Sequence, residues 1–147
     1  RKPTIETGLH VEIYKTRPEV NAIVHTHPLY STVFSCMGMD IPLIIDEAAQ
    51  VLGDVCRTAE YALPGSPELA QNCAKALGKK ANSCLLKAHG AVCVGETMEA
   101  AFKVAKVLEV TAQIYQMILA TGNQCYPLSE ENIAAMQYFI KNIYGQR

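Results

Sequence analysis

The sequence predicts a mixed α/β domain in which helices cover the faces of a modest sheet. Short apolar, β-branched runs typical of strands alternate with longer segments whose apolar residues recur at helical spacing. The 147 residues are enough for one domain with a sizeable core, and no linker or internal repeat divides them. We therefore expect residues 1–147 to form a single domain.

The first half of the chain alternates helices with strands. Leu9 and Ile13 share an apolar side in TIETGLHVEIYKTRP, which predicts a short helix that ends at Pro18. The segments that follow predict, in order, a strand at 20–27 (VNAIVHTH), a helix at 28–38, a short buried strand at 41–45 (IPLII) and a helix at 46–53.

The second half carries the strongest helix signals. Ser66 is placed to cap a helix, Pro67 follows at its first position and Gly78 closes it. The other segments predict a strand at 55–63, two strands within 83–96 around a turn at Gly90, a long helix at 97–122 and a final helix at 129–145 with Ser129 as its cap.

Composition restricts the partners and the compartment. The net charge of −1 offers no basic field for nucleic acid or an anionic membrane, and no apolar run approaches the roughly 20 residues that span a bilayer. The first ten residues lack the apolar core of a signal peptide. Six cysteines without a C-x-x-C pair indicate buried reduced thiols. We expect a cytoplasmic protein with neither nucleic acid nor membrane as a partner.

Two of the four histidines lie one residue apart at the end of an apolar strand. In a strand His25 and His27 project from one face, with Thr26 on the other, so both rings can reach one zinc ion. An isolated H-x-H is more often a pair of exposed polar residues. The apolar residues before it and a third histidine, His89, in CLLKAHGAVCVGE favour a metal site.

Several motifs together carry a family resemblance: PTIE, VHTHP, YALPGSPEL, AHGAVCVGE and the long helix after it. Over essentially its whole length the chain resembles the class II aldolase/adducin family, especially those members that act on L-fuculose 1-phosphate. The resemblance implies a three-layer α/β/α sandwich around a mostly antiparallel sheet. It also implies a homotetramer with sites at subunit interfaces, and an additional N-terminal segment that this chain lacks.

The resemblance implies a zinc-dependent aldolase that reversibly cleaves a ketose 1-phosphate into dihydroxyacetone phosphate and an aldehyde. His25, His27 and His89 would be the ligands of Zn²⁺, and three ligands leave the open position that a catalytic zinc needs. The metal would stabilise the charge of the broken carbon–carbon bond as an enediolate. Glu6 would be the general acid and base, although it is equally suited to the start of a helix.

The ends of the chain supply the remaining expected site residues. The tail IYGQR resembles a segment that reaches the site of an adjoining subunit, where Tyr144 would donate a proton to the aldehyde oxygen and Arg147 would make a polar contact. A frayed terminal turn is the alternative. Thr4 and Ile5 stand where the family has two serines that bind phosphate, and Ile5 offers only its backbone N–H. The expected substrate is a small phosphorylated sugar.

Three alternatives remain at this point. An L-ribulose-5-phosphate 4-epimerase of the same family would carry aspartates in place of Glu6 and Ala49. Sugar-acid decarboxylases and dehydratases of the family keep three histidines and an acid. An adducin-like association domain is not an enzyme and needs no metal.

Overall fold

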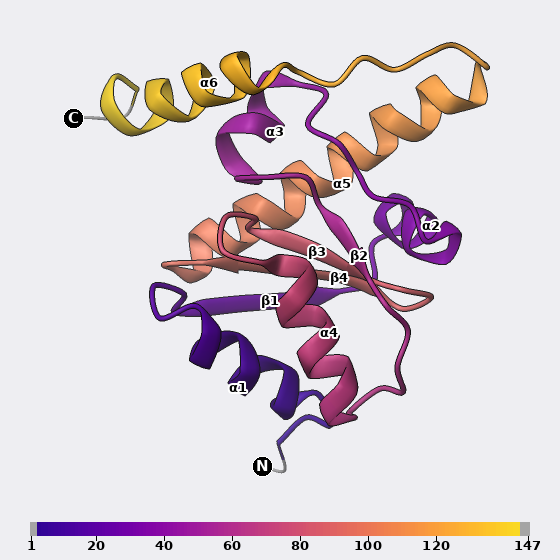
Figure 1. The fold of residues 1–147 in the computed structure, drawn as a ribbon, viewed down its shortest axis with the longest axis vertical. Coiled ribbons are helices and arrows are strands. Elements are labelled where there is room, and N and C mark those ends of the chain that lie inside the picture. The colour runs from indigo at the N-terminus through magenta and orange to yellow at the C-terminus, as the bar shows by residue number, and fades with distance from the viewer. Residues whose placement is uncertain (1–2, 145–147) are drawn as a thin grey trace.

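The computed structural model describes residues 3–144, which form three layers: helices, a sheet and helices again (Figure 1). The elements are α1 (Thr7–Thr16), β1 (Ala22–Thr26), α2 (Leu29–Met37), α3 (Asp46–Val51), β2 (Arg57–Ala59), α4 (Pro67–Leu77), β3 (Ser83–Leu86), β4 (Gly90–Gly95), α5 (Met98–Ala120) and α6 (Glu130–Asn142).

The strands lie in the order β1-β4-β3-β2. Both β1 and β3 pair antiparallel with β4, and β2 pairs parallel with β3. The register of the first pair brings His25 opposite Val92 and Thr26 opposite Ala91. The predicted α/β/α sandwich around a mostly antiparallel sheet is therefore confirmed.

Each face of the sheet has its own apolar core. Side chains of β4 alternate, so Ala91 and Cys93 join the cluster beneath α2, α3 and α5, whereas Val92 and Val94 join the cluster beneath α1 and α4. Helix α6 lies outside these layers and packs against α3 (Figure 1). None of the helices in residues 3–144 combines the length and the hydropathy needed to cross a membrane.

Three local expectations were wrong. Residues 41–45 are buried or half-buried but form no strand, because only Ile41 pairs, with Cys56, and Pro42 has no N–H to continue the pairing. The strand expected at 55–63 is shorter than predicted, because only Arg57–Ala59 form β2. The turn between the last two strands occupies residues 87–89, and Gly90 already begins β4.

Helix capping follows the sequence closely. The Ser66 hydroxyl accepts a hydrogen bond from the backbone N–H of Leu69, and the Ser129 hydroxyl accepts one from Asn132, as predicted. Helix α2 ends at Gly38, whose left-handed conformation (φ 64°) suits glycine. Pro28, at the start of α2, provides no side-chain cap.

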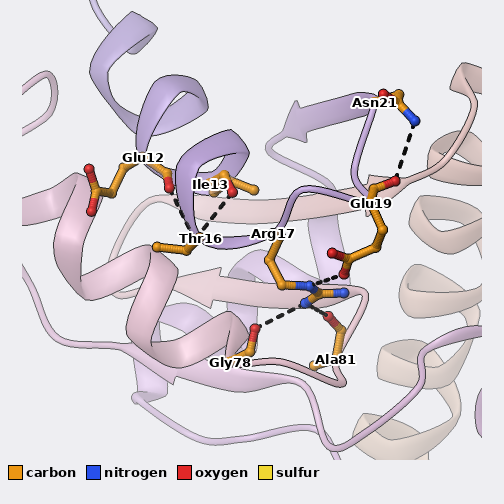
Figure 2. Close-up of polar contacts among 8 residues, drawn as sticks. All are labelled: Glu12, Ile13, Thr16, Arg17, Glu19, Asn21, Gly78 and Ala81. Carbon is orange, nitrogen blue, oxygen red and sulfur yellow. Dashed lines mark hydrogen bonds and ion pairs between the residues drawn. The ribbon is translucent and has the colours of Figure 1, made fainter.

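A buried arginine ties the entries to β1 and β3 together. Arg17 is 6% exposed, and its Nη1 donates to the carbonyl oxygens of Gly78 at 3.0 Å and Ala81 at 2.9 Å (Figure 2). Its Nε pairs with Glu19, and this hydrogen bond lowers the pKa of Glu19. The loop before β3 is therefore held against the loop before β1.

The cysteines are all free, and four of the six are buried. Burial raises the pKa of Cys56 to about 12, so this thiol stays protonated near neutral pH. Sγ of Cys73 and Sγ of Cys84 lie 3.5 Å apart between α4 and β3. These cysteines act as small apolar residues of the core.

Candidate metal centre

Three histidines that are distant in the sequence converge at one end of the sheet. His25 is near the end of β1, His27 follows that strand and His89 completes the turn between β3 and β4. The ring centroids lie 5.0 Å apart for His25 and His27, and 4.9 Å apart for each of the other two pairs. Within residues 3–144 these histidines form the one group of three potential metal ligands, with ligand atoms all within 4.8 Å of one another.

The spacing of these nitrogen atoms fits one divalent cation. Zinc binds imidazole nitrogen at about 2.0–2.1 Å, so two nitrogen ligands of a tetrahedral ion lie roughly 3.3 Å apart. The cluster therefore has to contract by at most roughly 1.5 Å, which side-chain rotation can supply. Three imidazoles leave at least one coordination position for a substrate oxygen.

The protein orients the ring of His25. Its Nδ1 lies 2.9 Å from the carbonyl oxygen of Ala91 on the neighbouring strand. Because a carbonyl oxygen only accepts, Nδ1 carries the hydrogen and Nε2 keeps the lone pair that a metal needs.

Glycine at position 90 makes room for His27. A Cβ atom there would lie 2.5 Å from Cδ2 of His27 and 2.5 Å from the carbonyl oxygen of Thr26. The glycine of the AHG motif therefore permits the close approach of β4 to the end of β1. This role of the glycine depends on the pairing of β4 with β1 and is not evident from the AHG motif alone.

A left-handed residue presents His89. Ala88 has φ 55°, which costs a non-glycine residue roughly 1–2 kcal/mol. The backbone N–H of Ala88 donates to the carbonyl oxygen of Ser35 at 3.1 Å, and that of His89 donates to Leu86 at 3.0 Å. The turn is thereby attached to the last part of α2.

Glu6 brings a carboxylate to the same region. It stands at the start of α1 and is 7% exposed, and neither of its carboxylate oxygens has a hydrogen-bond partner among the described residues. By strand alternation His25 projects on the side of Ile23, which packs in the core beneath α1. A buried carboxylate without a partner is costly, and a nearby bound cation would offset that cost.

The electrostatics around His89 favour the neutral state that binds metal. Burial is the main cause that lowers the pKa of His89 from 6.5, the charge of His25 lowers it further, and Glu6 opposes both. His89 is therefore neutral at pH 7, as a ligand must be. The pKa of His10 is also lowered, first by burial and then by His25. His10 lies one turn after Glu6 and is not part of the ligand group.

Comparison with known proteins identifies the family of this chain. The family model described as "Class II Aldolase and Adducin N-terminal domain" matches residues 1–116. The chain belongs to this family.

Several class II aldolases are similar to this chain. The 5-methylthioribulose-1-phosphate/5-deoxyribulose-1-phosphate aldolase of Rhodospirillum rubrum is 40% identical over 116 residues, which are 78% of this chain and 52% of that protein. The L-fuculose phosphate aldolase of Escherichia coli K12 is 35% identical over 145 residues, covering 99% of this chain and 66% of that protein. A solved L-fuculose 1-phosphate aldolase is 33% identical, with a TM-score of 0.89. The match covers 96% of this chain and 65% of that protein. The chain thus spans about half to two thirds of the length of these relatives.

Thr4 and Ile5, the residues expected to bind phosphate, come directly before Glu6. Thr4 is exposed, and its hydroxyl accepts the backbone N–H of Glu6 at 3.3 Å. The side chain of Ile5 is 74% exposed. A Cβ at Gly65 would lie 3.1 Å from the carbonyl oxygen of Ile5, so the loop before α4 runs beside it. The role of both residues stays a prediction.

Tyr144 is not brought to the histidines within one chain. It is 66% exposed and stacks on Phe139 of α6, with ring centroids 5.9 Å apart. In Figure 1 helix α6 lies at the upper left, whereas α2, which begins directly after His27 and Pro28, lies at the right. Action at an adjoining subunit stays a prediction, and Arg147 lies outside the described residues.

A functional candidate that the sequence analysis missed is Glu109 on α5. Its carboxylate accepts the backbone N–H groups of Tyr30 at 2.7 Å and Ser31 at 2.9 Å, and the Ser31 hydroxyl at 2.8 Å. The sequence gives only a weak indication of this role. Glu109 is an acid that directly precedes residues 110–120, a helical stretch without any charged side chain.

Proposed function

We propose that the protein is a zinc-dependent class II aldolase that reversibly cleaves a ketose 1-phosphate into dihydroxyacetone phosphate and an aldehyde. The observation that carries this proposal is the convergence of His25, His27 and His89 in a group whose ligand atoms lie within 4.8 Å of one another. A purely associative domain of the adducin type has no need of such a cluster.

The proposed reaction separates one carbon–carbon bond. The bond between the third and fourth carbons of the ketose breaks, and the fourth carbon becomes an aldehyde as its hydroxyl loses a proton. The electron pair stays with the third carbon, which must then take up a proton. A bound divalent cation supplies Lewis-acid stabilisation of the negative charge on the neighbouring oxygen atoms.

Glu6 is the residue that we assign to the proton transfer at the third carbon. It is buried and its carboxylate oxygens make no hydrogen bond within residues 3–144, so no described group competes for its lone pairs. A carboxylate that is screened from water can deliver and accept a proton without exchange with the solvent. Thr4 and Ile5 come directly before it and are the proposed phosphate contacts.

The substrate class rests on what the relatives have in common. The Rhodospirillum rubrum aldolase is named for sugar 1-phosphates with a modified fifth carbon, and the Escherichia coli aldolase is named for L-fuculose phosphate. Their names share a phosphorylated ketose and differ in the part that leaves as the aldehyde. L-fuculose 1-phosphate is therefore the first substrate to test, with 5-deoxyribulose 1-phosphate as the second.

We further propose a homotetramer whose sites lie between subunits. Tyr144 is exposed and stacks on Phe139 of α6, which supports action in a neighbouring subunit as the donor of a proton to the aldehyde oxygen. Arg147 would make a polar contact at the same site.

The position of Ala49 disfavours the epimerase alternative. The epimerases of the family use a second catalytic aspartate where this chain has Ala49. This residue is 0% exposed and lies inside α3, so it neither supplies a carboxylate nor faces a substrate.

The decisive test measures zinc content and aldol cleavage in the same preparations. The zinc-loaded protein should release dihydroxyacetone phosphate from L-fuculose 1-phosphate or 5-deoxyribulose 1-phosphate, detected by a coupled reductase. His89→Ala should lose both zinc and cleavage, whereas His10→Asn, the matched control outside the ligand group, should keep stoichiometric zinc. Cleavage at an undiminished rate by the metal-stripped protein would overturn the proposal.

A further inference from the structure

Helix α2 begins without a cap of its own. A cap residue normally accepts the free N–H groups of the first turn through its side chain, and Pro28 has no side-chain acceptor. The carboxylate of Glu109, on α5, fills that role for Tyr30 and Ser31 and also accepts the Ser31 hydroxyl. The cap therefore comes from a residue 78 positions away from Ser31.

The contact is polar, charged and largely shielded from water. Ser31 is 0% exposed, and Glu109 is half-buried. A carboxylate at a helix N-terminus complements the positive end of the helix dipole, and hydrogen bonds to a charged acceptor are stronger than neutral ones. Glu109 therefore attaches the first turn of α2 firmly to α5.

His27 lies between the end of β1 and that first turn. Strand β1 ends at Thr26, so His27 lies beyond the sheet pairing and only Pro28 separates it from α2. His27 and Glu109 line the same groove between β1 and α5. The residue His27 is exposed, so burial does not fix its imidazole ring in place.

We propose that Glu109 is a positioning residue of the metal centre: it fixes the start of α2 and, through Pro28, the ring of His27. This inference rests on the proposed metal site and names a residue that acts on one ligand without touching the cation. Without Glu109 the first turn of α2 loses its acceptor, and His27 samples positions from which it cannot join His25 and His89.

The test compares zinc dissociation constants, obtained by competition with a chromogenic chelator. Glu109→Gln keeps the size of the side chain but replaces one acceptor oxygen with an NH₂ group. That group donates and cannot accept, so it cannot replace the oxygen that accepts from Tyr30 or Ser31. We expect it to weaken zinc binding by about 10-fold to 100-fold, the range for residues that orient a metal ligand. Thr97→Ala is the matched control: it removes the cap of the same helix α5, roughly 18 Å from Glu109, and should leave the dissociation constant unchanged.

A double-mutant cycle shows whether Glu109 acts through His27. In a His27→Ala background, Glu109→Gln should have no further effect on the residual zinc affinity. Equal weakening in both backgrounds, or an unchanged affinity of Glu109→Gln in the otherwise native chain, would overturn the inference. If Glu109→Gln does not fold, Ser31→Ala removes only the side-chain hydrogen bond and should weaken binding in the same direction by a smaller factor. Failure of the native chain to bind zinc would instead refute the metal site itself.

Discussion

The close approach of Gly90 to the end of β1 gives a quantitative prediction for Gly90→Ala. The added Cβ would meet the carbonyl oxygen of Thr26 and Cδ2 of His27, each at 2.5 Å, whereas ordinary van der Waals contact begins near 3.4 Å. The shortfall of about 0.9 Å exceeds what bond-angle flexing absorbs cheaply. Because the Thr26 atom belongs to the backbone, β1 and β4 must separate or His27 must turn away.

The expected cost is about 2–3 kcal/mol of unfolding free energy, at the upper end of the usual penalty for overpacking. For a domain of this size each kcal/mol lowers the melting temperature by roughly 3–4 °C, so the melting temperature of the metal-free protein should fall by about 6–12 °C. Displacement of His27 should also weaken zinc binding by at least about tenfold. Thermal unfolding followed by circular dichroism and a chelator competition titration measure the two effects.

Gly8→Ala is the matched control for this substitution. Gly8 lies in α1, and a Cβ there would meet nothing within 4 Å. The same change should therefore stabilise the protein by about 0.5–1 kcal/mol, because alanine loses less backbone entropy in a helix. The reasoning is refuted if Gly90→Ala melts at the native temperature and binds zinc with native affinity.

Further predictions concern the candidate metal ligands, the titrating residues near them and one helix cap. His25→Ala should remove the bound metal and the cleavage activity together, as measured by metal analysis and the coupled assay. Glu6→Gln should stop turnover but keep zinc, and it should stabilise the metal-free protein by about 1–3 kcal/mol because a buried, unpaired carboxylate becomes neutral. The pKa values of His10 and His89 are lowered in the folded state, so the unfolded chain binds more protons as the pH falls through 6.5. Urea unfolding in the presence of a chelator should therefore give a lower midpoint at pH 5 than at pH 7. Ser66→Ala should cost about 1 kcal/mol of stability and leave zinc affinity unchanged.

The sequence predicted those parts of the fold that depend on local chemistry. Helix α4 was located to within a residue because Ser66 and Gly78 act on their own helix. The segment 41–45 was misread because an apolar run indicates burial but not pairing. Leu43 is 2% exposed without belonging to a strand, and its carbonyl oxygen accepts the N–H of Leu128 instead. Pairing partners depend on distant segments and cannot be read from a local pattern.

The candidate site was predictable in its ligands but not in the residues that support them. The H-x-H spacing and the family resemblance led to His25, His27 and His89, which the structure brings together. The role of Glu109 depends on the packing of α5 beside α2, and Glu109 carries no motif of its own. The left-handed conformation of Ala88 could not be predicted from the sequence either, because alanine rarely adopts it.

Each ligand of the candidate centre is held by contacts that do not involve a metal. His25 is fixed by the carbonyl oxygen of Ala91 and His89 by the turn at Ala88, and we propose that the start of α2 holds His27. Two apolar cores, one on each face of the sheet, stabilise this arrangement independently. The site therefore differs from a zinc finger, in which the metal supplies the folding energy. The backbone that carries the three histidines is folded before a metal binds, so binding requires side-chain rotation and not the ordering of the chain.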